Sequence, residues 1–152
     1  MLRTLLLSVH VGAGVAGLLA GPPAMAAALE GRRGTTAGRV YLAAVTLLTA
    51  TAAGLVALRP AALWPFLLLA VGTEAAIVGA GRVRPHARHV RLVCGSYVSL
   101  VTALLVVSWG SVLAWVLPTV VGTVLVERAA SSTRLPRPAR RSSRSPAPSP
   151  LP

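Results

Sequence analysis

The sequence predicts an all-α integral membrane protein: a bundle of five transmembrane helices followed by a disordered C-terminal tail. Of its 152 residues, 55% are apolar and 12% are charged, whereas about a quarter of the residues in a soluble domain are charged. The apolar residues form continuous runs and do not alternate with polar ones, which favours membrane helices over barrel strands. All 15 basic residues are arginines lying between or after these runs, as membrane proteins place them.

The first three predicted spans are apolar runs that can cross a hydrocarbon core about 30 Å thick. They cover residues 4–29, 40–58 and 61–81, and only the third contains a charged residue, Glu74. The start of the first run also resembles a cleavable leader, with Ala24-Met25-Ala26 as the cleavage motif. Cleavage would leave two arginine clusters on the outer side, so we expect the first span to be retained.

The rest of the apolar sequence predicts two further spans. Residues 92–126 carry no charge, and as one helix they would be about 52 Å long. Because this exceeds the membrane thickness, we expect a break at Trp109-Gly110-Ser111, which gives spans at about 89–108 and 112–126. The fifth is short and contains Pro118. If it fails to cross, the bundle has four helices.

The arginines predict the orientation. With five spans, one side of the membrane receives 13 of them and the other receives only Arg3 and Arg59. Because cytoplasmic loops of membrane proteins are rich in Arg, the N-terminus is expected outside and the C-terminus in the cytoplasm. Trp64, Trp109 and Trp115 all fall near the outer interface, which indole rings prefer.

The chain divides into a transmembrane domain, residues 1–128, and a tail, residues 129–152. The tail holds six Pro, five Arg and six Ser and no aromatic residue, so it cannot bury a core and is predicted to be disordered. Its arginines could associate with anionic lipid head groups. They are not interleaved with aromatic residues on a folded surface, so no nucleic-acid partner is expected.

Small residues recur every four positions in two spans. They are Ala13, Gly17 and Gly21 in the first span, and Gly95, Ser99 and Ala103 in the fourth. Such stripes let membrane helices approach closely, and they could also join copies of the chain in a homo-oligomer. The first stripe overlaps a literal G-x-G-x-x-G, but that motif needs a preceding strand and a soluble βαβ unit. We therefore interpret it as helix packing.

Glu74 is the strongest candidate for a functional residue, because an ionisable group inside a span is a functional hypothesis by default. Counting along the helices places other polar residues near its depth. This predicted intramembrane polar cluster comprises Glu74, Thr46, Arg91, Ser96, Tyr97 and Thr119. Two interpretations stay open: Glu74 is tied to Arg91 or Tyr97 and joins the third and fourth spans, or it forms part of a proton or ion path.

Two other residue types could carry chemistry. His10 lies inside the first span and is the only candidate cofactor ligand, for a b-type haem, whereas His86 and His89 are placed in the inner loop. A haem held by two histidines needs both at one depth, and His10 has no such partner, so no cofactor is predicted. Cys94 is the only cysteine, which excludes a Cys-based metal cluster and favours a buried small residue.

Several short motifs suggest a family. They are His10 with Gly14 and Gly21-Pro22, Gly38-Arg39-Val40-Tyr41, His89-Val90-Arg91, Ser96-Tyr97, and Trp115-Val116-Leu117-Pro118-Thr119. In their order they resemble an uncharacterised bacterial family of multi-pass membrane proteins, domain of unknown function 2306, over residues 5–126. The resemblance implies a bacterial cytoplasmic membrane and no known reaction. Members similar to this chain often carry a His-Arg pair where Gly34-Thr35 stands, which weighs against a His-based cofactor here.

The sequence therefore predicts a multi-pass membrane protein with a structural or accessory role. A proton- or ion-coupled carrier using Glu74 is the first alternative, and a b-haem redox protein using His10 is the second. The chain contains no catalytic triad, phosphate loop or metal-ligand spacing, so no enzymatic activity is expected.

Overall fold

The computed structural model describes residues 1–58 and 60–132, without the side chains of residues 60–63 and 112, and these residues form helices and short connections with no strand. The five helices are α1 (Leu2–Leu29), α2 (Thr36–Leu58), α3 (Pro60–Arg82), α4 (His86–Trp109) and α5 (Val112–Ser132). Each contains a stretch long and apolar enough to cross a membrane. The predicted all-α fold with five spans, the short fifth included, is confirmed.

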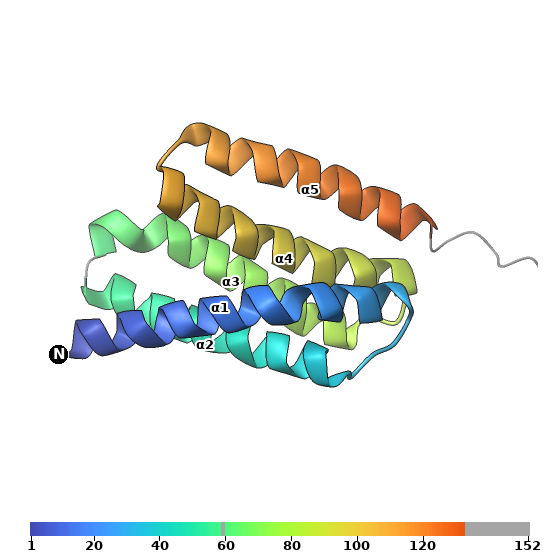
Figure 1. The fold of residues 1–152 in the computed structure, drawn as a ribbon, viewed down its shortest axis with the longest axis horizontal. Helices are drawn as coiled ribbons and strands as arrows, with labels where there is room; N and C mark the ends of the chain where they lie inside the picture. The colour runs from blue at the N-terminus through green and yellow to red at the C-terminus, as the bar shows by residue number, and fades with distance from the viewer. Residues whose placement is uncertain (59, 133–152) are drawn as a thin grey trace, which may run out of the picture.

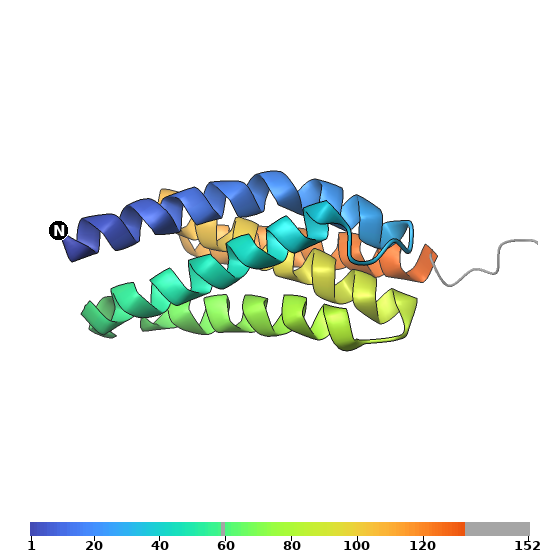
Figure 2. The same ribbon diagram turned by 90° about the horizontal axis from the view of Figure 1, so that it is seen from below.

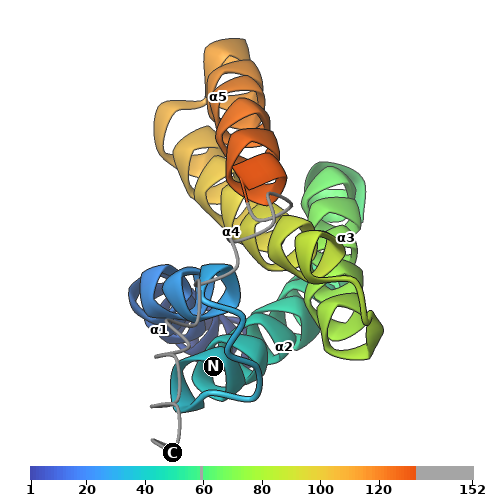
Figure 3. The same ribbon diagram turned by 90° about the vertical axis from the view of Figure 1, so that its right-hand side faces the viewer.

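Successive helices run up and down, so the connections fall at two ends of the bundle (Figures 1 and 2). We call the end with connections 30–35 and 83–85 and the end of α5 the basic end, because Arg32, Arg33 and Arg84 lie there. The opposite end, with the N-terminus and the α4–α5 turn, is the Arg-poor end. Helices α1 to α4 surround a common interior, whereas α5 lies outside this group and packs mainly on α4 (Figure 3).

The predicted break in the long apolar run is confirmed. Helix α4 ends at Trp109, and Gly110 adopts a left-handed conformation with φ 58° while its N–H donates to the carbonyl of Val106. A glycine is favoured at this position because a Cβ would be strained there. Helix α5 begins two residues later and packs back along α4.

Two helices extend further at the basic end than the apolar runs suggested. Helix α4 begins at His86, so the prediction that His86 and His89 lie in a loop is wrong; both are in its first two turns. Helix α5 continues to Ser132 instead of ending near Val126, so the first four residues of the predicted tail are helical. Charged residues end an apolar run without ending a helix, which explains both differences. Residues 133–152 of the tail lie outside the described residues.

The core lies in the half of the bundle nearest the basic end. Its largest fully buried side chain is Tyr41 of α2, which packs with Val45 of α2, Ile77 of α3 and Val93 of α4. A second, smaller cluster contains Cys94 of α4 and Ala130 of α5. The predicted burial of Cys94 is confirmed. Towards the Arg-poor end these tight contacts give way to a cleft.

The first small-residue stripe packs inside the chain. Ala13, Gly17 and Gly21 are all buried. Space at Gly17 is limited by Leu100 and Ala44, and space at Gly21 by the ring of Tyr97. Because Gly21 has no side chain, α1 can cross α4 closely near Tyr97.

Candidate functional site

Glu74 lies at the contact between α3 and α2, where its predicted neighbour Thr46 is its hydrogen-bond partner. The Thr46 hydroxyl donates to Oε1 of Glu74 at 2.8 Å. The second carboxyl oxygen, Oε2, is buried and has no hydrogen-bond partner within the described part of the chain. Glu74 and Thr46 are thus the two members of the predicted intramembrane polar cluster that the structure brings together.

Arg91 pairs with Glu127 and not with Glu74. Nε and Nη2 of Arg91 donate to Oε1 and Oε2 of Glu127 at 2.8 and 2.6 Å. The two side chains are 35% and 53% exposed, and they join α4 to α5 near the basic end. The expectation that Arg91 ties Glu74 to the fourth span is therefore wrong, because Arg91 faces α5 whereas Glu74 faces α2.

Ser96 and Tyr97 also point away from Glu74. The hydroxyl of Ser96 donates to the carbonyl of Val93 at 2.7 Å and lies 3.1 Å from the hydroxyl of Tyr41. Because the only hydroxyl proton of Ser96 is donated to Val93, Tyr41 is the donor in the bond between the two hydroxyl groups. Tyr97 donates to the carbonyl of Leu18 at 3.4 Å. These two residues join α4 to α2 and α1, and Tyr41 is a member of the network that sequence reasoning missed.

The cleft is a cavity of about 460 Å³ between α1, α2, α3 and α4 in the half nearest the Arg-poor end. Helices α1 and α4, close together near Gly21 and Tyr97, diverge towards this end (Figure 1). Twenty-two residues line the cleft, and only Arg3, His10, Thr73 and Ser99 among them are polar or charged. Its size and apolar lining fall in the range of small-molecule sites.

His10 is held in the wall of the cleft by Thr51 of α2. Nδ1 of His10 lies 2.9 Å from Oγ1 of Thr51. The hydroxyl of Thr51 in turn donates to the carbonyls of Leu47 and Leu48 at 2.8 and 2.9 Å. Because the hydroxyl proton of Thr51 is already donated to the backbone, Thr51 can only accept a hydrogen bond from His10. The imidazole proton of His10 is therefore on Nδ1, and Nε2 keeps a lone pair. The ring can therefore accept one hydrogen bond from a molecule in the cleft.

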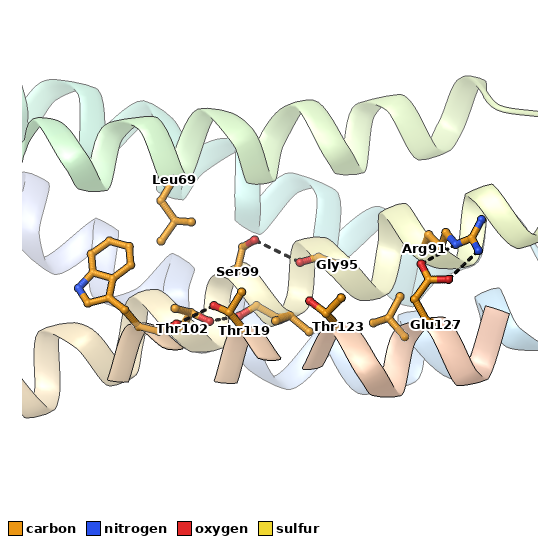
Figure 4. Close-up of a pocket in the computed structure, with 11 residues that line it drawn as sticks. Leu69, Arg91, Gly95, Ser99, Thr102, Thr119, Thr123 and Glu127 are labelled. Atoms are coloured by element: carbon orange, nitrogen blue, oxygen red, sulfur yellow. Dashed lines mark hydrogen bonds and ion pairs between the residues drawn. The ribbon is translucent and has the colours of Figure 1, made fainter. Parts of the chain in front are cut away.

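A second cavity, the groove, has a volume of about 480 Å³ and runs along the contact between α4 and α5 (Figure 4). Its lining includes Thr119, the last member of the predicted cluster, with Ser99, Thr102 and Thr123. Arg91 and Glu127 lie at one end of the groove (Figure 4). Glu74 lines neither the groove nor the cleft. The predicted polar cluster is thus divided between the α2–α3 contact, the core and the groove.

Arg33 and His89 each bind backbone carbonyls at the basic end. Nη1 and Nη2 of Arg33 donate to the carbonyls of Val83 and Arg84 at 2.6 and 3.0 Å. Nδ1 of His89 donates to the carbonyl of Ala80 at 2.8 Å. The contacts of Arg33 join the α1–α2 connection to the α3–α4 connection, whereas the contact of His89 joins α4 to α3 and gives His89 a structural role.

In the part of the chain that the structure describes, metal ligands do not gather at one place. Among residues 1–58 and 60–132, no group of three or more His, Cys, Asp or Glu side chains is placed to hold a metal ion. His10 lies in the half near the Arg-poor end, whereas His86 and His89 lie at the basic end. A haem bound between two of these histidines does not fit this arrangement.

Comparisons of the chain with protein-family models, with curated proteins and with solved structures found no match. The resemblance to domain of unknown function 2306 therefore stays a prediction.

Proposed function

We propose that this multi-pass membrane protein has an accessory role and binds one amphiphilic molecule in the cleft between α1 and α4. The molecule has an apolar chain and an anionic head group, as a phospholipid does. The observation that carries the proposal is the cleft itself, a cavity of about 460 Å³ with an almost wholly apolar lining. In the proposed orientation the basic end faces the cytoplasm, so the cleft opens in the outer half of the membrane.

Arg3 and the apolar walls of the cleft match the two parts of such a molecule. Arg3 is exposed and lies at the Arg-poor end, where a head group would sit, and guanidinium groups bind phosphates well. His10 lies about two turns deeper, below the level at which the head group would sit. Between and beyond them, side chains such as Leu7 and Leu104 are exposed on the walls and would contact the apolar chain.

Binding of a lipid probe tests the proposal. The purified protein is mixed with dioleoyl phosphatidylglycerol or with dioleoyl phosphatidylcholine, and the retained lipid is counted by native mass spectrometry. We expect the wild type to retain one phosphatidylglycerol in preference to phosphatidylcholine. Arg3→Gln removes the cation at the mouth and should lose this preference.

A cavity-filling variant separates binding in the cleft from lipid that coats the whole surface. Ala103 lines the cleft, so Ala103→Phe should reduce retention of phosphatidylglycerol. Ala43→Phe makes the same change on an exposed face of α2 and should retain the lipid. Thermal unfolding first checks that both variants are folded. If the two folded variants then retain equal amounts of phosphatidylglycerol, the cleft is ruled out as the binding site.

One observation favours a second candidate function, proton coupling through Glu74. Its Oε2 atom is buried without a partner in the described residues, and a carboxyl oxygen in that position can bind a proton. The carboxyl also lies inside a span, where ionisable groups are costly and usually functional. Proton movement in proteoliposomes, compared between the wild type and Glu74→Gln, tests this candidate.

A further inference from the structure

The groove between α4 and α5 presents hydrogen-bond acceptors along its length. Ser99, Thr102 and Thr119 each donate their proton to a backbone carbonyl four residues earlier in the same helix, at 3.2, 2.8 and 2.7 Å. Because a hydroxyl group has one proton and two lone pairs, the three oxygens remain as acceptors. All three residues line the groove (Figure 4). A molecule in the groove is therefore met by oxygen lone pairs.

The two ends of the groove differ in polarity. Near the basic end lies the ion pair of Arg91 and Glu127, both partly exposed. At the other end Trp115 lines the groove, and its ring lies 6.0 Å from the ring of Phe66 between their centroids. Leu69 of α3 lies on the same side as Phe66 and lines both the groove and the cleft. The groove is thus polar towards the basic end and closed by apolar side chains on the side of the Arg-poor end.

The groove also has room for water. A buried water needs about 15 Å³ of probe-occupied volume and two to four polar partners, and the groove offers about 480 Å³. A Cβ added at Gly95, on the α4 side of the groove, would meet no atom within 4 Å. Space therefore continues from the ion pair past Gly95 to the hydroxyl groups.

We propose that the groove is a water-filled half-channel that opens at the basic end and ends at Leu69, Phe66 and Trp115. Its acceptor lining selects hydrogen-bond donors, so it admits water and small cations and disfavours anions. This inference concerns α4 and α5 and is independent of the molecule bound in the cleft.

Cysteine accessibility in membrane vesicles tests the half-channel. Thr119→Cys and Thr123→Cys place thiols in the groove, and Val121→Cys places one at similar depth on the opposite, exposed face of α5. Each variant is treated from one side of the membrane at a time with an impermeant cationic reagent, trimethylammonium-ethyl methanethiosulfonate. From the basic end we expect Thr119→Cys and Thr123→Cys to react faster than Val121→Cys by about tenfold or more.

The charge preference is measured with an anionic reagent, sulfonatoethyl methanethiosulfonate. Each rate is divided by the rate of that reagent with a free thiol in solution, so that intrinsic reactivity cancels. We expect the cationic reagent to be preferred at Thr119→Cys. The wild type, whose buried Cys94 is its only cysteine, gives the background rate.

Labelling with lipid-soluble N-ethylmaleimide checks that every introduced thiol is present and reactive. If all three variants react with it but the groove thiols react with the charged reagents no faster than Val121→Cys, lipid fills the groove and the proposal is overturned. Faster reaction from the Arg-poor end would overturn the direction of opening. Equal normalised rates for the two charges would overturn the selection of cations.

Discussion

Gly21 of α1 lies directly against the aromatic ring of Tyr97 of α4, so that a Cβ at this position would overlap the ring. The contact marks the close crossing of α1 and α4, beyond which the two helices diverge (Figure 1). The cleft lies where they have diverged. The close crossing of α1 and α4 therefore depends on a glycine that lies outside the cleft.

The first prediction concerns this crossing. Gly21→Leu should destabilise the protein by about 1–3 kcal/mol, the usual cost of forcing extra atoms into a packed contact. Gly12→Leu is the matched control, because a Cβ at Gly12 meets nothing within 4 Å. Thermal unfolding in detergent compares the two, and equal midpoints would contradict a tight crossing at Tyr97.

The second prediction uses the direction of the hydrogen bond between Tyr41 and Ser96. Ser96→Ala leaves the fully buried hydroxyl of Tyr41 without its acceptor and should cost about 1–3 kcal/mol. Tyr41→Phe removes the donor but leaves Ser96 bonded to Val93, and should cost less, about 0.5–1.5 kcal/mol. The free energy of unfolding of each variant, measured against the wild type, shows which substitution costs more. The reverse order would show that Ser96 donates to Tyr41.

The span pattern could be derived from the sequence because the bilayer leaves few choices. A continuous apolar run must be a helix, and a run longer than the membrane must turn, as Gly110 does. The helix ends at the basic end were less predictable. Apolar runs mark the edge of the hydrocarbon core, whereas His86 and the residues after Val126 continue the helices beyond the runs.

The polar contacts were predicted less well because counting residues gives depth along a helix but not the direction of a side chain. Thr46 was placed at the depth of Glu74, and the two do meet. Arg91 was also placed near Glu74 but faces α5, where Glu127 lies. The signal that could have found this pair was the short α4–α5 turn, since antiparallel neighbours bring the start of one helix beside the end of the next.

The third prediction concerns topology. If the basic end is cytoplasmic, as its arginines suggest, a reporter active only in the cytoplasm should work when fused after Ser132, the last residue of α5. A reporter active only outside should be silent there and active when fused in the turn at Gly110. A signal from the external reporter after Ser132 would reverse the orientation and place the cleft in the inner half of the membrane.

The fourth prediction separates the two interpretations of Glu74. A Gln at this position can still accept the hydrogen bond that Thr46 donates to Oε1 at 2.8 Å, so Glu74→Gln should change the free energy of unfolding by no more than about 0.5 kcal/mol. A Gln side chain cannot bind and release a proton. If Glu74 couples protons, proteoliposomes containing a pH-sensitive dye should show proton movement with the wild type and none with Glu74→Gln, although both proteins fold. Thr46→Val is the companion variant, because it removes the hydrogen bond but keeps the carboxyl group. If proton movement is the same in the wild type and in Glu74→Gln, the carboxyl group only joins α3 to α2 through Thr46, and Thr46→Val should then lower stability without changing the dye signal.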